Sequence, residues 1–90
     1  MTRRVYRYQV PVDDQPHTFK VAGMPLRVAA SGDARTVEFW IEDDDQFPAV
    51  TRRAFQVFGT GQPLPDIAKW RGTCERHPLG LVWHLYEVEP

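Results

Sequence analysis

Apolar and polar residues alternate with a period of two along most of the chain, and this pattern predicts short β-strands. The clearest example is the segment 36–42, in which Val37, Phe39 and Ile41 alternate with Trp40 and with polar residues. Similar alternation predicts further strands at 6–10, 18–21, 26–30, 53–58, 70–74 and 81–88. Residues that favour turns, mainly Gly, Pro, Asp and Ser, separate these segments.

Strands this short and this regularly spaced predict an all-β fold in a single domain, residues 1–90. The expected architecture is a small antiparallel β-sandwich or a partly open barrel of six to seven strands. One short helical turn is expected at 66–69, because Pro65 suits the first position of a helix. The last segment, 81–88, is apolar on both faces, which is typical of a central strand that is covered on both sides.

The composition fits a small globular domain, with 42% hydrophobic and 26% charged residues in a chain of 90. The formal net charge of -1 argues against a dedicated nucleic-acid binder. No apolar run is long enough to span a bilayer, so no membrane association is expected. Cys74 is the only cysteine, which excludes an internal disulfide and favours a reducing, cytoplasmic setting.

The charged residues gather in two clusters, with arginines at the start of the chain and an acidic run at 42–45 that we expect to form a loop. If Val37 and its alternating neighbours face the core, Trp40 points away from it, among glutamates. A large aromatic residue in polar surroundings is common at protein interfaces, although packing against a loop or a second sheet is the alternative. The sequence therefore predicts a partner-contact surface formed by Trp40, Glu38, Glu42, Asp44, Arg3 and Arg4.

The segment 58–65, Phe-Gly-Thr-Gly-Gln-Pro-Leu-Pro, resembles a phosphate-binding loop at first sight. A P-loop, however, needs a Lys followed by Ser or Thr, and Pro63 removes a backbone N–H where donors are required. A structural turn is the favoured interpretation. The alternative is a small-molecule or nucleotide site formed by Gly59–Gly61 with Arg52, Arg53 or Trp70.

No catalytic or metal-binding constellation emerges from the remaining polar residues. The three histidines, His17, His77 and His84, lack the close ligand pairs of a structural zinc site, and Cys74 with His77 forms only one such pair. A nucleophile, a base and an orienting residue are not found together. We therefore expect no enzymatic activity, no catalytic residues, no metal and no cofactor.

Three segments resemble a family of small uncharacterised proteins from bacteriophages and prophages. They are the turn at 58–65, the tetrapeptide Trp-Arg-Gly-Thr at 70–73 and the segment Leu-Val-Trp-His-Leu-Tyr-Glu at 81–87. The opening strand, which ends in Val10-Pro11-Val12, is similar as well. The resemblance implies a small protein of phage type in the cytoplasm of the host cell, and it assigns no functional residues.

The expected function is that of a non-enzymatic, phage-type accessory protein that binds a host or phage protein. A homodimer is also expected to be accessible, because small β-domains have to protect their edge strands. Weak nucleic-acid binding through Arg3, Arg4 and Arg7 is the remaining alternative.

Overall fold

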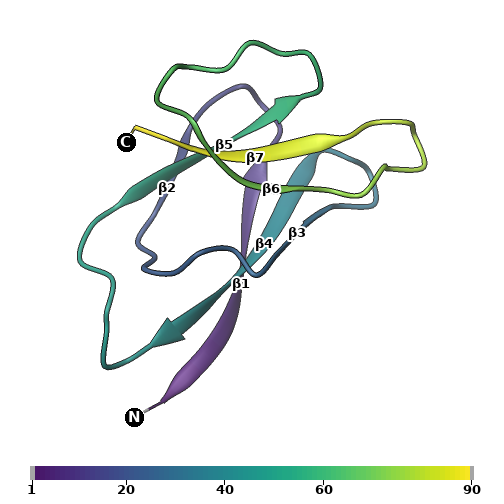
Figure 1. Ribbon diagram of the computed structural model, residues 1–90. Helices are drawn as coiled ribbons and strands as arrows, with labels where there is room; N and C mark the ends of the chain where they lie inside the picture. The colour runs from purple at the N-terminus through teal and green to yellow at the C-terminus, as the bar shows by residue number, and fades with distance from the viewer. Residues whose placement is uncertain (1, 90) are drawn as a thin grey trace.

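The computed structural model describes residues 2–89 and contains seven strands in two antiparallel sheets, which confirms the all-β prediction (Figure 1). No helix of the described chain is long and apolar enough to cross a membrane. The strands are β1 (Arg3–Pro11), β2 (His17–Phe19), β3 (Arg27–Ala30), β4 (Thr36–Asp44), β5 (Arg53–Gly59), β6 (Lys69–Thr73) and β7 (Trp83–Val88).

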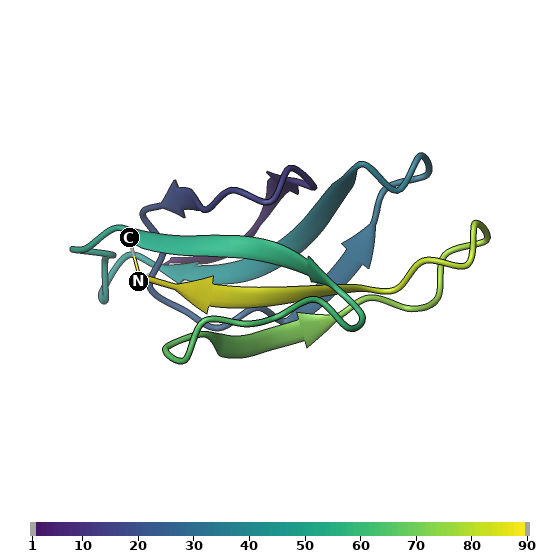
Figure 2. The ribbon, with the colours of Figure 1, turned by 90° about the horizontal axis from the view of Figure 1, so that it is seen from above.

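The two sheets have the strand orders β1-β4-β3 (sheet A) and β2-β5-β7-β6 (sheet B). Seen from above, they lie over one another as the two layers of a sandwich (Figure 2). β7 lies between β5 and β6, as its two apolar faces predict.

The core lies between the sheets and is built around four aromatic rings. Phe39 of sheet A and Phe55 of sheet B have their ring centroids 5.1 Å apart, and Phe19 contacts both. Tyr8 stacks on Phe39 at 5.4 Å. Because successive residues of a strand face opposite sides, the period-two apolar residues fill this space. Val10, Val37, Ile41 and Leu85 complete the fully buried set.

The predicted helical turn at 66–69 is absent, and a single tight turn closed by Ala68 N–H donating to Pro65 C=O (3.0 Å) takes its place. β5 and β6 flank β7 and both run antiparallel to it, so the segment 60–68 has to cross β7 (Figure 1). Pro63 and Pro65 lie in this segment, and because proline lacks a backbone N–H, they limit helical hydrogen bonding there. Phe58, on the outer face of sheet B against Tyr86, is only 3% exposed.

The acidic run is not a loop, because Glu42, Asp43 and Asp44 continue β4. β1 pairs with this end of β4 and sets Arg3 opposite Asp44 and Arg4 opposite Asp43. Opposite charges on paired strands stabilise an antiparallel ladder, which explains why the strand extends through acidic residues. The two charge clusters therefore face each other across the β1–β4 pair.

Sheet B carries one irregularity, a β-bulge in β6 between Trp70 and Gly72. The extra residue is Arg71. Just beyond it, Gly72 faces Val28 of β3, and a Cβ on this glycine would lie 3.0 Å from Val28 Cβ and closer still to Cγ2. The missing side chain lets β6 approach β3, so the two sheets close against each other at this edge.

Candidate binding site

The partner-contact residues predicted from the sequence lie on sheet A. The cross-strand register places Arg3, Glu38, Trp40, Glu42 and Asp44 on its outer face. Arg4 is opposite Asp43 and so belongs to the other face. The structure therefore brings five of these six residues together on one surface.

Trp40 is partly buried, and the sequence suggested a more exposed ring. It lies between Arg7 of β1 and Arg27 of β3, which the linear sequence does not place beside it. The acidic neighbours have partners of their own, since Arg7 Nη1 is 3.1 Å from Glu38 and Arg3 Nη1 is 3.3 Å from Glu42. This outer face thus presents ion pairs around a partly covered ring.

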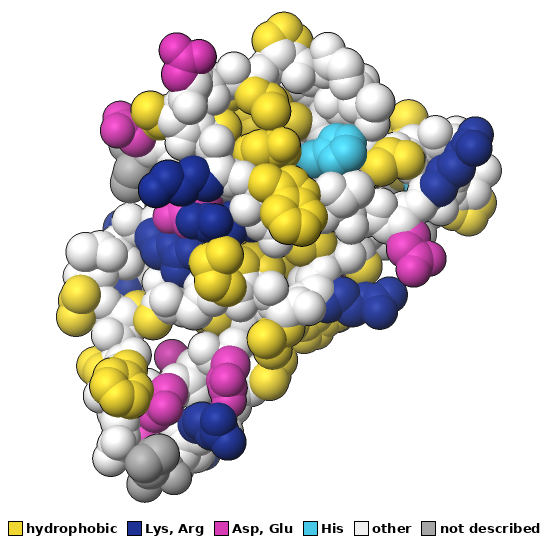
Figure 3. Space-filling model, viewed as in Figure 1, with side chains coloured by type: hydrophobic (Ala, Val, Ile, Leu, Met, Phe, Trp, Pro, Cys, Tyr) yellow, Lys and Arg dark blue, Asp and Glu magenta, His cyan; other side chains and the backbone are white. Residues whose placement is uncertain are grey.

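A more open apolar surface lies at the edge where β3 meets β6. Trp70 is 59% exposed there, beside Met24 at 55% and Leu26 at 63%. These residues border a hollow of about 450 Å³, which we call the β3–β6 groove. Its lining consists of Met24, Pro25, Leu26, Arg27, Val28, Trp70, Arg71, Gly72, Thr73 and Glu75. In Figure 3, hydrophobic side chains gather near the position of β6 beside a dark blue group that surrounds acidic atoms.

A chain of hydrogen bonds holds the Trp70 ring in place. Its Nε1–H donates to Thr73 Oγ1 at 2.9 Å, and the same oxygen is 3.0 Å from His84 Nδ1. His84 Nε2 in turn is 2.9 Å from Thr60 Oγ1. The exposed indole is therefore fixed before any ligand arrives.

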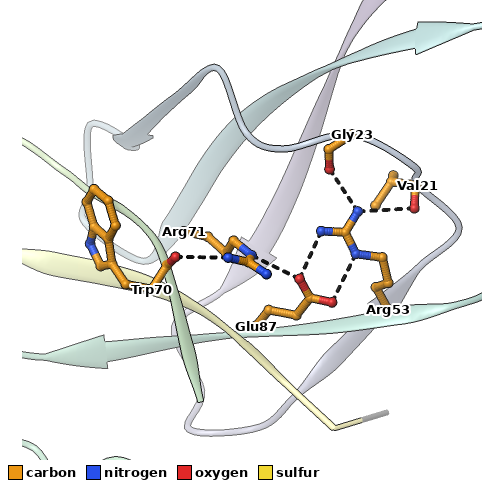
Figure 4. A network of polar contacts seen from close by, with 6 residues as sticks. All are labelled: Val21, Gly23, Arg53, Trp70, Arg71 and Glu87. Carbon is orange, nitrogen blue, oxygen red and sulfur yellow. Dashed lines mark hydrogen bonds and ion pairs between the residues drawn. The ribbon is translucent and has the colours of Figure 1, made fainter. Parts of the chain in front are cut away.

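Next to Trp70, the bulge directs Arg71 toward Glu87 of β7 (Figure 4). Arg71 Nε donates to Glu87 Oε1 at 2.9 Å. From β5, Arg53 donates through Nε and Nη2 to both oxygens of the same carboxylate, at 2.9 and 2.8 Å. The three side chains are only 17–19% exposed, so solvent screens the network weakly.

Hydrogen bonds from Arg53 and Arg71 hold the pKa of the Glu87 carboxyl below its ordinary value, against the opposing effect of burial. Glu87 is thus the ionised centre of the network, and two guanidinium groups surround one carboxylate. The excess positive charge lies at a second hollow of about 410 Å³, lined by all three side chains and by Val50. Arg71 lines both this hollow and the β3–β6 groove, so the two adjoin at its guanidinium.

Comparison with known proteins places this chain in a family. The sequence model of a domain of unknown function, DUF7352, matches residues 1–90. The chain belongs to this family. Comparison with curated proteins and with solved structures finds no match. The prediction of an uncharacterised family is therefore confirmed.

In this DUF7352 domain, the segments 58–65, 70–73 and 81–87 meet on sheet B. Thr60, Thr73 and His84 come one from each segment and are joined by the hydrogen bonds beside Trp70. Gly72 makes the close approach to β3, and Glu87 binds the two arginines. Of these segments, 70–73 forms one wall of the β3–β6 groove, and the other two bind it through His84 and Glu87.

The Gly59–Gly61 turn of the DUF7352 domain is closed by two hydrogen bonds between Gly59 and Gln62. Gly59 N–H donates to Gln62 Oε1 at 3.0 Å, and Gln62 N–H donates to Gly59 C=O at 3.1 Å. Gly61 has a φ of 87°, whereas Gly59 faces the ring of Trp83, so only one of the two glycines is required for its backbone conformation. Arg53 lies at the opposite end of β5. Of the residues in the alternative nucleotide site, Arg52 and Arg53 thus lie away from the turn, whereas Trp70 is linked to it through Thr73, His84 and Thr60.

Cys74 and His77 are both buried, and their surroundings indicate a structural role for each. Cys74 is 3% exposed, and burial raises the pKa of its thiol to about 11, so it is a poor nucleophile. His77 Nε2 lies 3.1 Å from Ser31 C=O and 3.0 Å from Gly32 C=O, while Nδ1 accepts from Leu79 N–H. Within residues 2–89, no group of three or more potential ligands is arranged to hold a metal.

Proposed function

We propose that this DUF7352 protein is a non-enzymatic interaction module that binds a protein partner through the β3–β6 groove. The observation that carries the proposal is Trp70, a large indole that is 59% exposed yet fixed by its hydrogen bond to Thr73. Tryptophan is among the residues that most often dominate the energy of protein interfaces. A side chain that is already ordered loses less conformational entropy on binding.

The surroundings of Trp70 support a protein partner. Met24 and Leu26 extend the exposed apolar surface on the other side of the groove, and Arg71 adds a charged group at its end. Apolar patches rimmed by polar groups mark interaction sites in soluble proteins. Sheet A's outer face, with Trp40 partly buried between paired charges, is the second surface that a partner could contact.

We further propose that the module acts in the cytoplasm, as a phage-type accessory protein that modulates a host protein. The resemblance described above supports the phage setting, and the single buried thiol supports a reducing compartment. Self-association through an edge strand remains a separate proposal, which the molecular mass in solution from light scattering would test.

Affinity capture of partners from a host-cell extract, with the wild-type protein and two variants as baits, tests whether the β3–β6 groove binds the partner. Trp70→Lys should raise the Kd of the captured partner about 30-fold, because the loss of a dominant interface residue costs roughly 2 kcal/mol or more. The control is Leu79→Lys, which makes the same kind of change at a residue that is 67% exposed and lies outside the groove. Equal capture by wild type and Trp70→Lys would contradict the proposal.

A further inference from the structure

Arg71 has hydrogen-bond donors to spare. A guanidinium carries five N–H groups, and within residues 2–89 this one uses Nε for Glu87 and Nη1 for Trp70 C=O (3.3 Å). Its third nitrogen, Nη2, has no partner in Figure 4. No side-chain nitrogen of the described residues is both buried and unpaired, so Nη2 is not completely buried. Arg71 therefore retains unused donors, and it lines both hollows.

Arg53 differs because its donors are occupied. Its Nε and Nη2 bind Glu87, and Nη1 donates to Gly23 C=O at 2.8 Å and to Val21 C=O at 3.3 Å (Figure 4). Arg53 also lies over the ring of Phe55, 5.3 Å from its centroid, which joins the network to the core. Arg53 and Glu87 thus act as positioning residues, and of the two arginines bound to Glu87 it is Arg71 that has donors left to bind a ligand.

The charges around Arg71 select the class of anion. The charged residues that line the groove are Arg27, Arg71 and Glu75, which together leave a single positive charge. Glu87 is already paired with both Arg53 and Arg71. A planar carboxylate fits the fork of a guanidinium and its one negative charge matches this balance, whereas a phosphate dianion exceeds it by one charge. The site therefore favours a carboxylate.

The apolar residues that line the groove determine which kind of group lies next to the carboxylate in the ligand. Trp70, Met24 and Leu26 line the same hollow as Arg71, so an apolar group can occupy the groove while a charged group of the same ligand reaches Arg71. β6 is an edge strand that pairs only with β7, which leaves backbone groups free for an extended peptide.

We propose that the β3–β6 groove recognises an extended peptide segment in which a carboxylate lies next to an apolar side chain. Arg71 binds the carboxylate, and the apolar side chain packs on Trp70. This inference rests on the proposed function and specifies the chemistry of the partner.

A titration of the isolated protein with two capped pentapeptides tests the inference. One peptide has a glutamate between two leucines, and its twin has glutamine instead. Chemical shifts of the Trp70 indole N–H and the Gly72 amide report binding in the groove. We expect the glutamate peptide to bind roughly fivefold more tightly, the gain expected of a partly screened ion pair. Inorganic phosphate should not compete at equal concentration.

Variants assign the preference to Arg71. Arg71→Gln should abolish the difference between the twins, whereas Arg76→Gln, which removes an exposed arginine outside the groove, should preserve it. The dispersion of the amide spectrum shows whether each variant is folded. The glutamate and glutamine peptides can also be compared on the wild-type protein alone, so that part of the test does not depend on the folding of a variant.

The outcomes separate this inference from the proposed function. Equal affinity for the two peptides overturns carboxylate recognition but leaves an apolar groove that binds partners. Competition by phosphate at equal concentration overturns the selection of a carboxylate. If neither peptide shifts the groove signals, the inference is wrong, and the proposed function is then judged by the dependence of partner capture on Trp70.

Discussion

Glu87→Gln should lower the free energy of unfolding by about 2–4 kcal/mol at neutral pH, the loss expected when one member of a largely buried ion pair is removed. The glutamine leaves Arg53 and Arg71 together without a counter-charge, at side chains that are only 17% exposed. Urea denaturation at pH 7 measures the effect. Glu89→Gln is the matched control, because it removes an exposed carboxylate two residues away and should change stability by less than about 0.5 kcal/mol.

The same pair of variants gives an acid test. The pKa of Glu87 lies below its ordinary value of 4.5 in the folded protein, so its contribution to stability is complete above that value and is lost as the pH falls through the folded pKa. Asp13 and Asp33 also have lowered pKa values and add to acid sensitivity in every variant. The gap in stability between wild type and Glu87→Gln should therefore narrow between pH 5 and pH 2, by the usual linkage. A constant gap would show that Glu87 stabilises the fold by something other than its charge.

Gly72→Ala should destabilise the protein by about 3 kcal/mol, at the upper end of the range for overpacked sites. The new methyl group would overlap Val28, a β-branched side chain that cannot turn away. Adding Val28→Ala should restore part of the lost stability, because it removes the atom that is closest to the new methyl group. Thermal and urea unfolding of the single and double variants measure this coupling.

Gly32→Ala is the control for Gly72→Ala, since nothing lies within 4 Å of the position its Cβ would occupy. It should leave stability nearly unchanged. A tolerated Gly72→Ala would mean that β6 and β3 do not approach as closely as described, and the shape of the groove would then differ as well.

The sequence predicts the strands well because each is defined by its own alternation. Val37, Phe39 and Ile41 face the core. The segment 81–88 is apolar on both faces, and this correctly indicates that β7 is a central strand. Local periodicity also gives the direction of Trp40. It does not give the burial of this ring, because the neighbours Arg7 and Arg27 come from other strands through the register of sheet A.

The sequence did not reveal contacts between residues that are far apart in the chain, because strand pairing brings these residues together. The acidic run looks like a loop until β1 supplies arginines opposite Asp43 and Asp44. Arg53 lies 34 residues from Glu87 and Arg71 lies 16 from it, and a bulge is needed to bring Arg71 to the carboxylate. Trp-Arg-Gly-Thr at 70–73 was the available signal, since a glycine inside a strand pattern often marks a bulge or a close backbone approach.

The order of pairing also determines how the chain can fold. Of the strand pairs, only β3–β4 and β6–β7 join strands that are consecutive in the sequence. β1 pairs with β4 and β2 pairs with β5, so each of these pairs can form only after the intervening strands have been synthesised and a long loop has closed. Closing such long loops slows folding, so a refolding time of milliseconds to seconds is expected for this topology. During that interval the nine residues of β1 have no partner strand, and their three arginines would keep the nascent edge from aggregating. Stopped-flow refolding would measure the time, and microsecond refolding would contradict this consequence of the strand order.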